Sequence, residues 1–460
     1  MRHRSRPLFV TAAAIGLAVC LSAPFSAVSV AEAVPIEPVP SFTLPPEVDE
    51  FFRPPADLVV AAQPGQVLRA RAIAPAFFGL APLNVDAWQL LYRTTDSAGA
   101  PSATVTTVLK PRGAAPEGGR KLLSYQIAED SAAQYCAASY VVQRGSLPID
   151  TINATEIMVP IAAGIGQGWT VAIPDYEGPR SAYGASMQNA QATLDGIRAV
   201  TGFEPAQLSG PATPTALWGY SGGTIPSSFA AEYAQQYAPE LNIVGVAAGG
   251  IAAADWATVL RFNNRGMATG LVSTVLAGLA NEYPELRRLI QQRVDPLGQF
   301  LVDSKYVLCH SIGAAIMPFW DYYGSFGGDP LEQPVAQRII AQNNLGQRTP
   351  TMPVFMYQAQ LDEVLPIGPV DRLADKYCAE GAPSVTYVRE LLAEHGIGFL
   401  TSMPAAFTWL RDRLDGVPIS GCDVSSTTTQ ITDPVFQAGL LDIVPTAVRA
   451  LVGEAIGTNA

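Results

Sequence analysis

Short apolar runs alternate with helix-like stretches along most of this chain, and the alternation predicts its fold. Apolar runs bounded by turn residues are typical of buried parallel strands. Such runs occupy residues 121–126, 169–175, 215–218, 241–249, 352–359 and 384–391. Helix-like patterns over 185–200, 224–237 and 371–377 separate several of them. Strands that alternate with helices predict an α/β protein with a doubly wound, mostly parallel sheet.

Two segments depart from this alternation. Residues 88–95 and 103–109 alternate apolar with polar positions around a Gly/Ala/Pro turn, which predicts an antiparallel hairpin at a sheet edge. Residues 251–347 contain helix-like runs at 271–280 and 284–290 and no strand-like pattern. A helical insertion over the carboxyl ends of the strands would form a lid above a site there. An ordinary second helical layer is the alternative.

One strand-like run leads directly into a glycine-rich turn. Residues 219–223 read Gly-Tyr-Ser-Gly-Gly, after the run at 215–218 and before the helical pattern at 224–237. A Gly-x-Ser-x-Gly turn between strand and helix exposes its serine as a nucleophile. With 40 glycines in 460 residues the motif alone is weak, but its context has the required order. Ser221 is therefore the candidate nucleophile.

A serine nucleophile needs a general base, normally histidine. The chain has three histidines. His3 lies in the N-terminal leader described below, and His310 follows a cysteine inside the helical insertion, where a structural role is expected. His395 lies in a loop between an apolar run and the helix that begins near residue 399. We therefore expect His395 to be the base.

A carboxylate that orients the base should follow a strand between the serine and the histidine. Asp362 comes directly after the apolar run at 352–359 and fits best. Glu363 is the alternative, because sequence does not tell which of two adjacent side chains points inward.

The negative oxygen that develops in acyl transfer needs two hydrogen-bond donors. The backbone N–H of Gly222, directly after the nucleophile, is one candidate. The other should come from the loop after an early strand, where Asp130 lies in residues 126–131. An aspartate there would donate through its backbone or as a protonated acid. A carboxylate that only caps a turn is the alternative.

The N-terminus has the pattern of a secretory signal peptide. Arg2, Arg4 and Arg6 precede an apolar run at 8–21, and residues 31–33 read Ala-Glu-Ala, a typical cleavage site. A membrane anchor is the alternative, although the run is short and no second long apolar run follows. We expect residues 1–33 to be removed and 34–460 to fold as one domain.

Charge and cysteine content narrow the possible functions. The formal net charge is −12, which disfavours nucleic acid as a partner. Beyond the leader the cysteines are Cys136, Cys309, Cys378 and Cys422. In a secreted protein an even number suggests two disulfides, with three possible pairings. The wide spacing disfavours a metal site, and we expect no metal and no cofactor.

Taken together, these motifs resemble the secretory lipases of the lipase-A type within the α/β-hydrolases. The resemblance rests on residues 219–223, 125–131, 173–178, 362–366 and 394–395, and it spans most of residues 40–425.

The resemblance implies a fold and a set of site residues. It implies a triad of Ser221, Asp362 and His395, with an oxyanion hole at Asp130 and Gly222. These assignments agree with the candidates chosen from the residues themselves.

The resemblance also implies how the rest of the domain is organised. It implies disulfides Cys136–Cys309 and Cys378–Cys422, the first of which would tie the insertion to the core. The insertion at about 251–347 would be a lid, and residues 423–460 would be a C-terminal tail or flap.

The expected function is a secreted serine carboxylic-ester hydrolase, foremost a triacylglycerol lipase. Its partner would be a lipid ester at an oil–water or membrane interface, and the protein would act as an extracellular monomer, with envelope association also open. An acyltransferase or a short-chain esterase could use the same triad. A non-catalytic envelope-binding protein on a lipase fold is an alternative of a different class.

Overall fold

The computed structural model describes residues 34–147 and 155–457. The expected signal peptide at 1–33 lies outside the described residues. No helix within the described ranges is both long and apolar enough to cross a bilayer.

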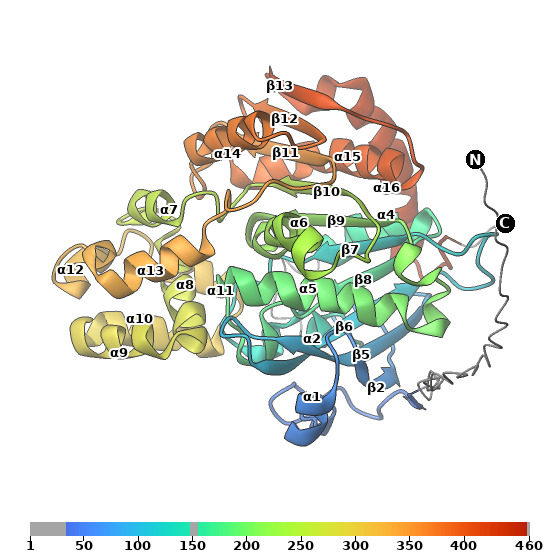
Figure 1. Ribbon diagram of the computed structural model, residues 1–460, viewed down its shortest axis with the longest axis horizontal. Helices are drawn as coiled ribbons and strands as arrows, with labels where there is room; N and C mark the ends of the chain where they lie inside the picture. The colour runs from blue at the N-terminus through green and yellow to red at the C-terminus, as the bar shows by residue number, and fades with distance from the viewer. Residues whose placement is uncertain (1–33, 148–154, 458–460) are drawn as a thin grey trace, which may run out of the picture. The chain divides into compact units, whose positions relative to one another are not determined.

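An 11-stranded sheet organises the fold, with strand order β1-β2-β5-β6-β8-β7-β9-β10-β11-β12-β13 (Figure 1). The strands are β1 Ile36–Glu37, β2 Val67–Ala72, β5 Asp86–Thr95, β6 Pro101–Lys110, β7 Leu122–Gln126, β8 Thr170–Pro174, β9 Thr215–Tyr220, β10 Ile243–Gly249, β11 Val354–Ala359, β12 Ser384–Glu390 and β13 Gly421–Thr427. Every neighbouring pair from β8 to β13 is parallel. A small second sheet pairs β3 Ala76–Phe77 with β4 Ala81–Pro82. The predicted mostly parallel α/β fold is confirmed.

The predicted hairpin is β5 with β6, which pair antiparallel and extend the sheet beyond β8. Both strands are slightly longer than the pattern predicts: β5 begins two residues earlier, at Asp86, and β6 extends from Pro101 to Lys110. Five strands have no counterpart among the predicted runs: the two-residue strands β1, β3 and β4, and the longer strands β2 and β13. β2 is only partly buried, and β13 is exposed along nearly its whole length, so neither has the apolar run of a central strand.

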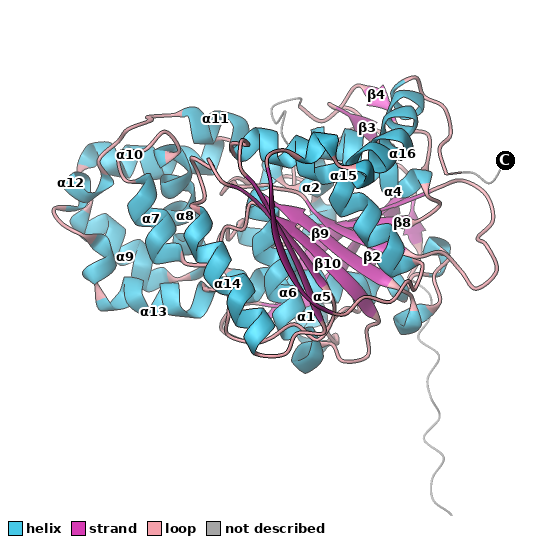
Figure 2. Cartoon of the chain, turned by 90° about the horizontal axis from the view of Figure 1, so that it is seen from above, coloured by secondary structure: helices cyan, strands magenta, loops and turns pink. Residues whose placement is uncertain are grey.

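Helices cover both faces of the sheet. The helices α5 Ser186–Thr201, α6 Thr224–Tyr237 and α14 Ile367–Ala379 pack on one face. The helices α2 Ala138–Val141, α4 Ala162–Gly166, α15 His395–Leu414 and α16 Pro434–Leu451 pack on the other. Figure 2 shows these two layers on either side of the strands. A sheet buried on both faces explains why its central strands read as continuous apolar runs.

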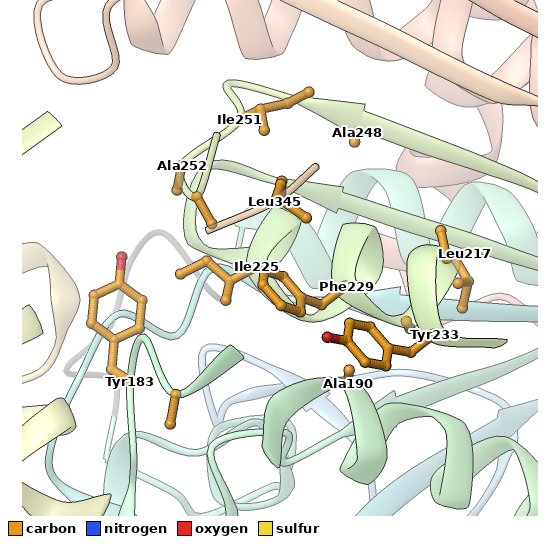
Figure 3. Close-up of a cluster of buried hydrophobic side chains, with 14 of the residues drawn as sticks. Tyr183, Ala190, Leu217, Ile225, Phe229, Tyr233, Ala248, Ile251, Ala252 and Leu345 are labelled. Atoms are coloured by element: carbon orange, nitrogen blue, oxygen red, sulfur yellow. The ribbon is translucent and has the colours of Figure 1, made fainter. Parts of the chain in front are cut away.

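The core beneath α6 holds the glycine-rich turn in place. Figure 3 shows Leu217 of β9 close to Phe229 and Tyr233 of α6, with Ala190 of α5 beside them. The rings of Phe229 and Tyr233 stack with centroids 5.9 Å apart. Replacing a buried phenylalanine with alanine typically costs about 3–5 kcal/mol. This packing fixes the start of α6, and therefore the turn that precedes it.

The segment at 251–347 is helical, as its pattern predicts, and lies between β10 and β11. Its helices are α7 Trp256–Asn263, α8 Thr269–Glu282, α9 Pro284–Arg293, α10 Pro296–Ser304, α11 His310–Ala315, α12 Tyr322–Phe326 and α13 Pro334–Asn343. We call this segment the helical insertion. Figures 1 and 2 show its helices gathered at one end of the sheet, where the parallel strands end. Its role as a lid stays a prediction.

The described part of the predicted C-terminal tail packs against the domain. Residues 423–427 complete β13, and α16 follows after the short helix η10 Gln430–Thr432. The helix α16 packs against α15 and α4. Whether this segment acts as a flap stays a prediction.

Candidate active site

Ser221 occupies a strained turn between β9 and α6. Its φ is 52°, in the left-handed region that non-glycine residues rarely adopt. A Cβ at Gly219 would lie 2.2 Å from the carbonyl oxygen of Gly223, and one at Gly223 would lie 2.1 Å from that of Gln126. No side chain fits at these distances, so the turn requires both glycines. This explains the motif that the sequence displays.

His395 begins helix α15 and faces the serine. Its Nε2 lies 2.9 Å from Ser221 Oγ. Glu394 caps the helix by accepting from the backbone N–H groups of Gly396 and Ile397. The ring of Tyr220 lies beside the imidazole, with centroids 5.2 Å apart. The imidazole therefore approaches the serine from a fixed helix end.

Asp362 lies on the other side of the imidazole, in the loop after β11. Its Oδ2 lies 2.8 Å from His395 Nδ1. Its Oδ1 accepts from the backbone N–H groups of Val364 and Leu365, at 2.9 and 2.7 Å. Gln358 Nε2 donates to Oδ2 at 2.9 Å. The buried carboxylate is thus held in one orientation toward the ring.

Glu363, the alternative carboxylate, has a different contact. Its Oε2 accepts from the backbone N–H of His395 at 3.1 Å. It therefore supports the histidine backbone, whereas Asp362 binds the ring itself. Of the two adjacent acids, Asp362 is the one that contacts the imidazole of His395.

The surroundings of His395 shift its basicity. Burial by itself lowers the pKa of His395, but the charge and hydrogen bond of Asp362 raise it more, with Glu363 and Asp130 adding to the effect. The net result is a pKa above the ordinary value of 6.5. A histidine with a raised pKa accepts a proton from serine more readily.

Asp130 lies over the turn that follows the serine. Its φ is 40°, and its carboxyl group is buried. A Cβ placed on Gly222 would lie 1.6 Å from Asp130 Oδ1. The loop after β7 and the turn after β9 are therefore in direct contact. The structure brings together all five site residues that the sequence predicts.

His310, for which the sequence predicts only a structural role, also lies at this site. Its Nδ1 is 2.9 Å from the carbonyl oxygen of Ala128, and its Nε2 is 3.6 Å from Asp130 Oδ2. The second contact is too long for a hydrogen bond. Sequence offered one signal for this placement, which is the position of His310 directly after Cys309.

The Cys136–Cys309 disulfide holds the same two segments together. The structure forms this pair and Cys378–Cys422. Near the first disulfide, Tyr135 OH donates to the carbonyl of Val307 at 2.6 Å. Residues 307–310 of the helical insertion are thus attached to the loop that carries Asp130.

With this geometry established, comparison with known proteins identifies the family. A family model described as secretory lipase matches residues 143–421. The chain belongs to this family. A probable inactive lipase of Mycobacterium tuberculosis is 38% identical over 413 residues, covering 89% of this chain and 91% of that protein. Lipase A of Arthroderma benhamiae is 36% identical over 431 residues, covering 90% of this chain and 89% of that protein.

Solved structures agree with the family assignment. Candida antarctica lipase A in its closed state has a TM-score of 0.80 and 26% identity, covering 90% of this chain and 98% of that structure. The secretory lipase family and its named lipases make this chain a member of a family of ester hydrolases.

In this member of the secretory lipase family, two cavities meet at Ser221. A cavity of about 560 Å³ is lined by Ser221, His395 and mostly apolar residues that include Leu271, Ala314 and Leu400. A smaller pocket of about 30 Å³ extends from the serine into the helical insertion. Its walls are formed mainly by apolar side chains, among them Val259, Leu260, Leu271, Val272 and Val275. The surroundings of the serine thus suit an ester with an apolar portion.

Two further buried acids, Glu129 and Glu177, lie close to Asp130. Burial, followed by the charges of Glu129 and Asp130, raises the pKa of Glu177 well above its ordinary value. Burial raises the pKa of Tyr183 in the same way, with the charges of Asp130 and Glu177 adding to the effect. Burial and the neighbouring negative charges therefore favour the protonated form of Glu177. Among the described residues, no cluster of His, Cys, Asp or Glu could hold a metal ion.

Proposed function

We propose that this protein is a secreted serine ester hydrolase whose substrates are lipid esters, foremost triacylglycerols. The observation that carries the proposal is the continuous chain of contacts from Ser221 through His395 to Asp362. Family membership alone does not carry it, because one relative is named a probable inactive lipase. The apolar cavities beside the serine support an ester with an acyl chain.

The contacts support a two-step reaction. His395 Nε2 removes the proton from Ser221 Oγ as this oxygen attacks the ester carbonyl carbon. Asp362 stabilises the imidazolium that forms. The N–H of Gly222 and a donor from Asp130 stabilise the negative oxygen of the tetrahedral intermediate.

The intermediate then collapses to an acyl-enzyme. The bond between the carbonyl carbon and the alcohol oxygen breaks, and His395 protonates the departing alcohol. In the second step His395 removes a proton from water, and the resulting attack releases the fatty acid and restores Ser221. This cycle consumes one ester and one water and needs no redox partner.

Secretion is supported by the N-terminal pattern and by two disulfides. Disulfides persist in oxidising compartments outside the cytosol. The structure places Cys136 with Cys309 and Cys378 with Cys422. The helical insertion, which contributes α11 and part of α8 to the walls around Ser221, supports the proposed lid.

Initial rates test the proposal most directly. Wild type should hydrolyse emulsified long-chain triacylglycerol, with a rise in rate once the substrate passes its solubility limit. Ser221→Ala should lower the rate by more than about 10⁴-fold with an unchanged circular dichroism spectrum. Ser228→Ala, a buried serine on α6, serves as the matched control and should retain the rate.

Three outcomes would count against the proposal. Turnover retained by Ser221→Ala would exclude this serine as the nucleophile. Saturation on soluble short-chain esters without long-chain turnover would favour a short-chain esterase. Product analysis with an added alcohol acceptor that shows transfer in preference to hydrolysis would favour an acyltransferase.

A further inference from the structure

Helix α16 exposes an unusually apolar face. Its buried side contacts the domain through residues such as Phe436, Gly439 and Ile443. Its outward side carries large apolar residues at successive turns, with Leu441 76% and Val448 54% exposed. The outward stripe consists of Val435, Leu440, Leu441, Val444, Val448, Leu451 and Val452. The helix has 18 residues, so the stripe runs for about 27 Å.

The few charges on α16 do not interrupt this stripe. Asp442 pairs with Arg411 of α15, and Arg449 pairs with Glu454 at 2.8 Å. A surface helix normally turns charged and polar residues toward water. Helix α14 on the opposite face of the sheet follows that rule and exposes residues such as Lys376. The outward side of α16 therefore has little of the polar surface expected of a helix in water, with Gln437 and Arg449 as its exposed polar residues.

The stripe continues the apolar rim of the Ser221 cavity. Helix α15 is exposed at Ile397 and Leu400, and Leu400 lines the cavity. The next two turns of α15 are buried where α16 lies close to them. A Cβ on Gly439 would lie 2.4 Å from the carbonyl oxygen of Pro404, which shows how closely the two helices approach. The outward stripe of α16 thus begins near the point where the exposed part of α15 ends.

The opposite rim of the cavity is apolar as well. Met267 and Ile312 of the helical insertion are 63% and 49% exposed, and Met267 lines the cavity. Figure 2 shows α11, α15 and α16 along the same side of the strands, opposite α5 and α6. An apolar surface therefore extends from the cavity opening along α16.

We propose that the outward stripe of α16, together with Ile397 and Leu400, docks the protein on the surface of uncharged lipid. This inference rests on the proposed lipid-ester substrate. Attraction to anionic lipid requires clustered Lys and Arg, whereas this chain has a net charge of −12 and the stripe contains no cation. Docking through α16 requires no movement of the helical insertion, and it places the Ser221 cavity beside the lipid.

Flotation with triacylglycerol emulsion droplets tests the docking surface. The double variant Leu441→Glu/Val448→Glu adds two charges to the stripe. Its matched control, Leu58→Glu/Val60→Glu, changes the same residue types on α1 Ala56–Ala61, where they are 39% and 68% exposed. Figure 2 shows α1 on the side opposite α16. All proteins carry Ser221→Ala, so that hydrolysis does not alter the droplets.

The α16 variant should bind droplets at least about tenfold more weakly than its parent, because each charge would have to enter lipid or hold the helix away. The α1 control should bind like the parent. In the Ser221 background, circular dichroism and soluble-ester rates verify that both double variants fold. Droplet binding is measured without turnover, so this experiment tests the docking surface even if the protein proves not to hydrolyse triacylglycerol.

Several results would overturn the inference. Equal droplet binding by the two double variants would remove α16 from the docking surface. A parent protein that binds anionic vesicles more tightly than neutral droplets would contradict the uncharged ligand. Size-exclusion chromatography that shows a parental dimer, dissociated by the α16 variant, would assign the stripe to a second copy of the chain.

Discussion

The two sides of the Ser221 site are held in different ways. On one side, Asp362 and His395 come from the ends of neighbouring parallel strands, and direct hydrogen bonds join them to the serine. On the other side, Asp130 is positioned by a loop that contacts the helical insertion, where His310 and the Cys136–Cys309 disulfide meet it.

Asp362 and His395 are therefore positioned by the sheet alone, whereas the position of Asp130 also depends on the helical insertion. The carboxyl ends of parallel strands meet at one edge, so any strand-end loops there lie close together. The approach of the helical insertion to the loop of Asp130 has no such general cause. It depends on particular contacts, such as Tyr135 OH to Val307 and Ser131 Oγ to Leu308. Variants on the two sides should therefore have different consequences.

The largest effect is expected from Asp362→Asn on the strand-end side. It removes the negative charge that stabilises the imidazolium, and should lower kcat by about 10⁴-fold. The matched variant Glu363→Gln should lower kcat by less than about tenfold, because its amide oxygen still accepts from the N–H of His395. Single-turnover kinetics on a soluble ester would measure both.

The reverse order of these effects would assign the orienting carboxylate to Glu363. Equal and small effects would mean that neither acid is required. The two residues are adjacent in the chain and differ mainly in their contact with His395. Asp362 contacts its imidazole, whereas Glu363 contacts its backbone N–H.

A smaller effect is expected from Asp130 on the insertion side. Asp130→Ala removes a candidate donor to the developing oxyanion, and should lower kcat by about 10²-fold to 10³-fold with little change in KM. Asp130→Asn retains a donor in its amide group and should lose less activity. Measured kcat values for both variants would decide. Unchanged turnover in Asp130→Ala would leave this residue a role in the turn alone.

Much of the sheet could be predicted because its central strands are buried on both faces. Such strands need continuous apolar runs, and the run at 215–218 lies within β9, whereas the run at 352–359 contains β11. Edge strands have weaker requirements. In β13, exposed polar residues such as Ser425 and Ser426 are compatible with pairing to β12, so no apolar run indicates the strand.

The candidate site shows a similar limit. The spacing of strand ends was enough to select Ser221 and His395, since the chain offers few histidines. It was not enough to choose between Asp362 and Glu363, because a loop can turn either side chain inward. The contact of His310 with the Asp130 loop joins segments far apart in the chain, and its one signal in the sequence is the position of His310 directly after Cys309.

The pH dependence of kcat/KM should show how strongly Asp362 and Glu363 each raise the pKa of His395. The base must be neutral to act, so a raised pKa of His395 places the rise of kcat/KM above about pH 6.5. Asp362→Asn removes the larger stabilisation of the imidazolium, so the midpoint should fall. Glu363→Gln should lower it less. NMR titration of His395 in the three proteins would measure this, and a higher midpoint in Asp362→Asn would contradict the assigned contact.

The smallest effect on turnover is expected from loss of the disulfides. One disulfide lies on the sheet side and the other joins the Asp130 loop to the helical insertion, so they allow the same comparison. Replacing either pair with serines should lower the free energy of unfolding by about 2–4 kcal/mol. Cys378–Cys422 joins α14 to β13 on the sheet side, with a sequence separation of 44. Its loss should change kcat by less than about twofold, because neither cysteine lies near Ser221 in the cavity walls.

Loss of the other pair should also affect the reaction. Cys136–Cys309 spans 173 residues and joins the Asp130 loop to the helical insertion beside His310. Without it the loop can move relative to Gly222, and a donor displaced by 1 Å loses much of its effect on the transition state. We therefore expect the Cys136/Cys309 serine variant to have a kcat about threefold to tenfold lower than the Cys378/Cys422 serine variant. Urea titrations would identify conditions in which the two variants are equally folded, and kcat would be compared there. Equal kcat in the two serine variants would mean that the loop keeps its position without the insertion, and would remove the distinction between the two sides of the site.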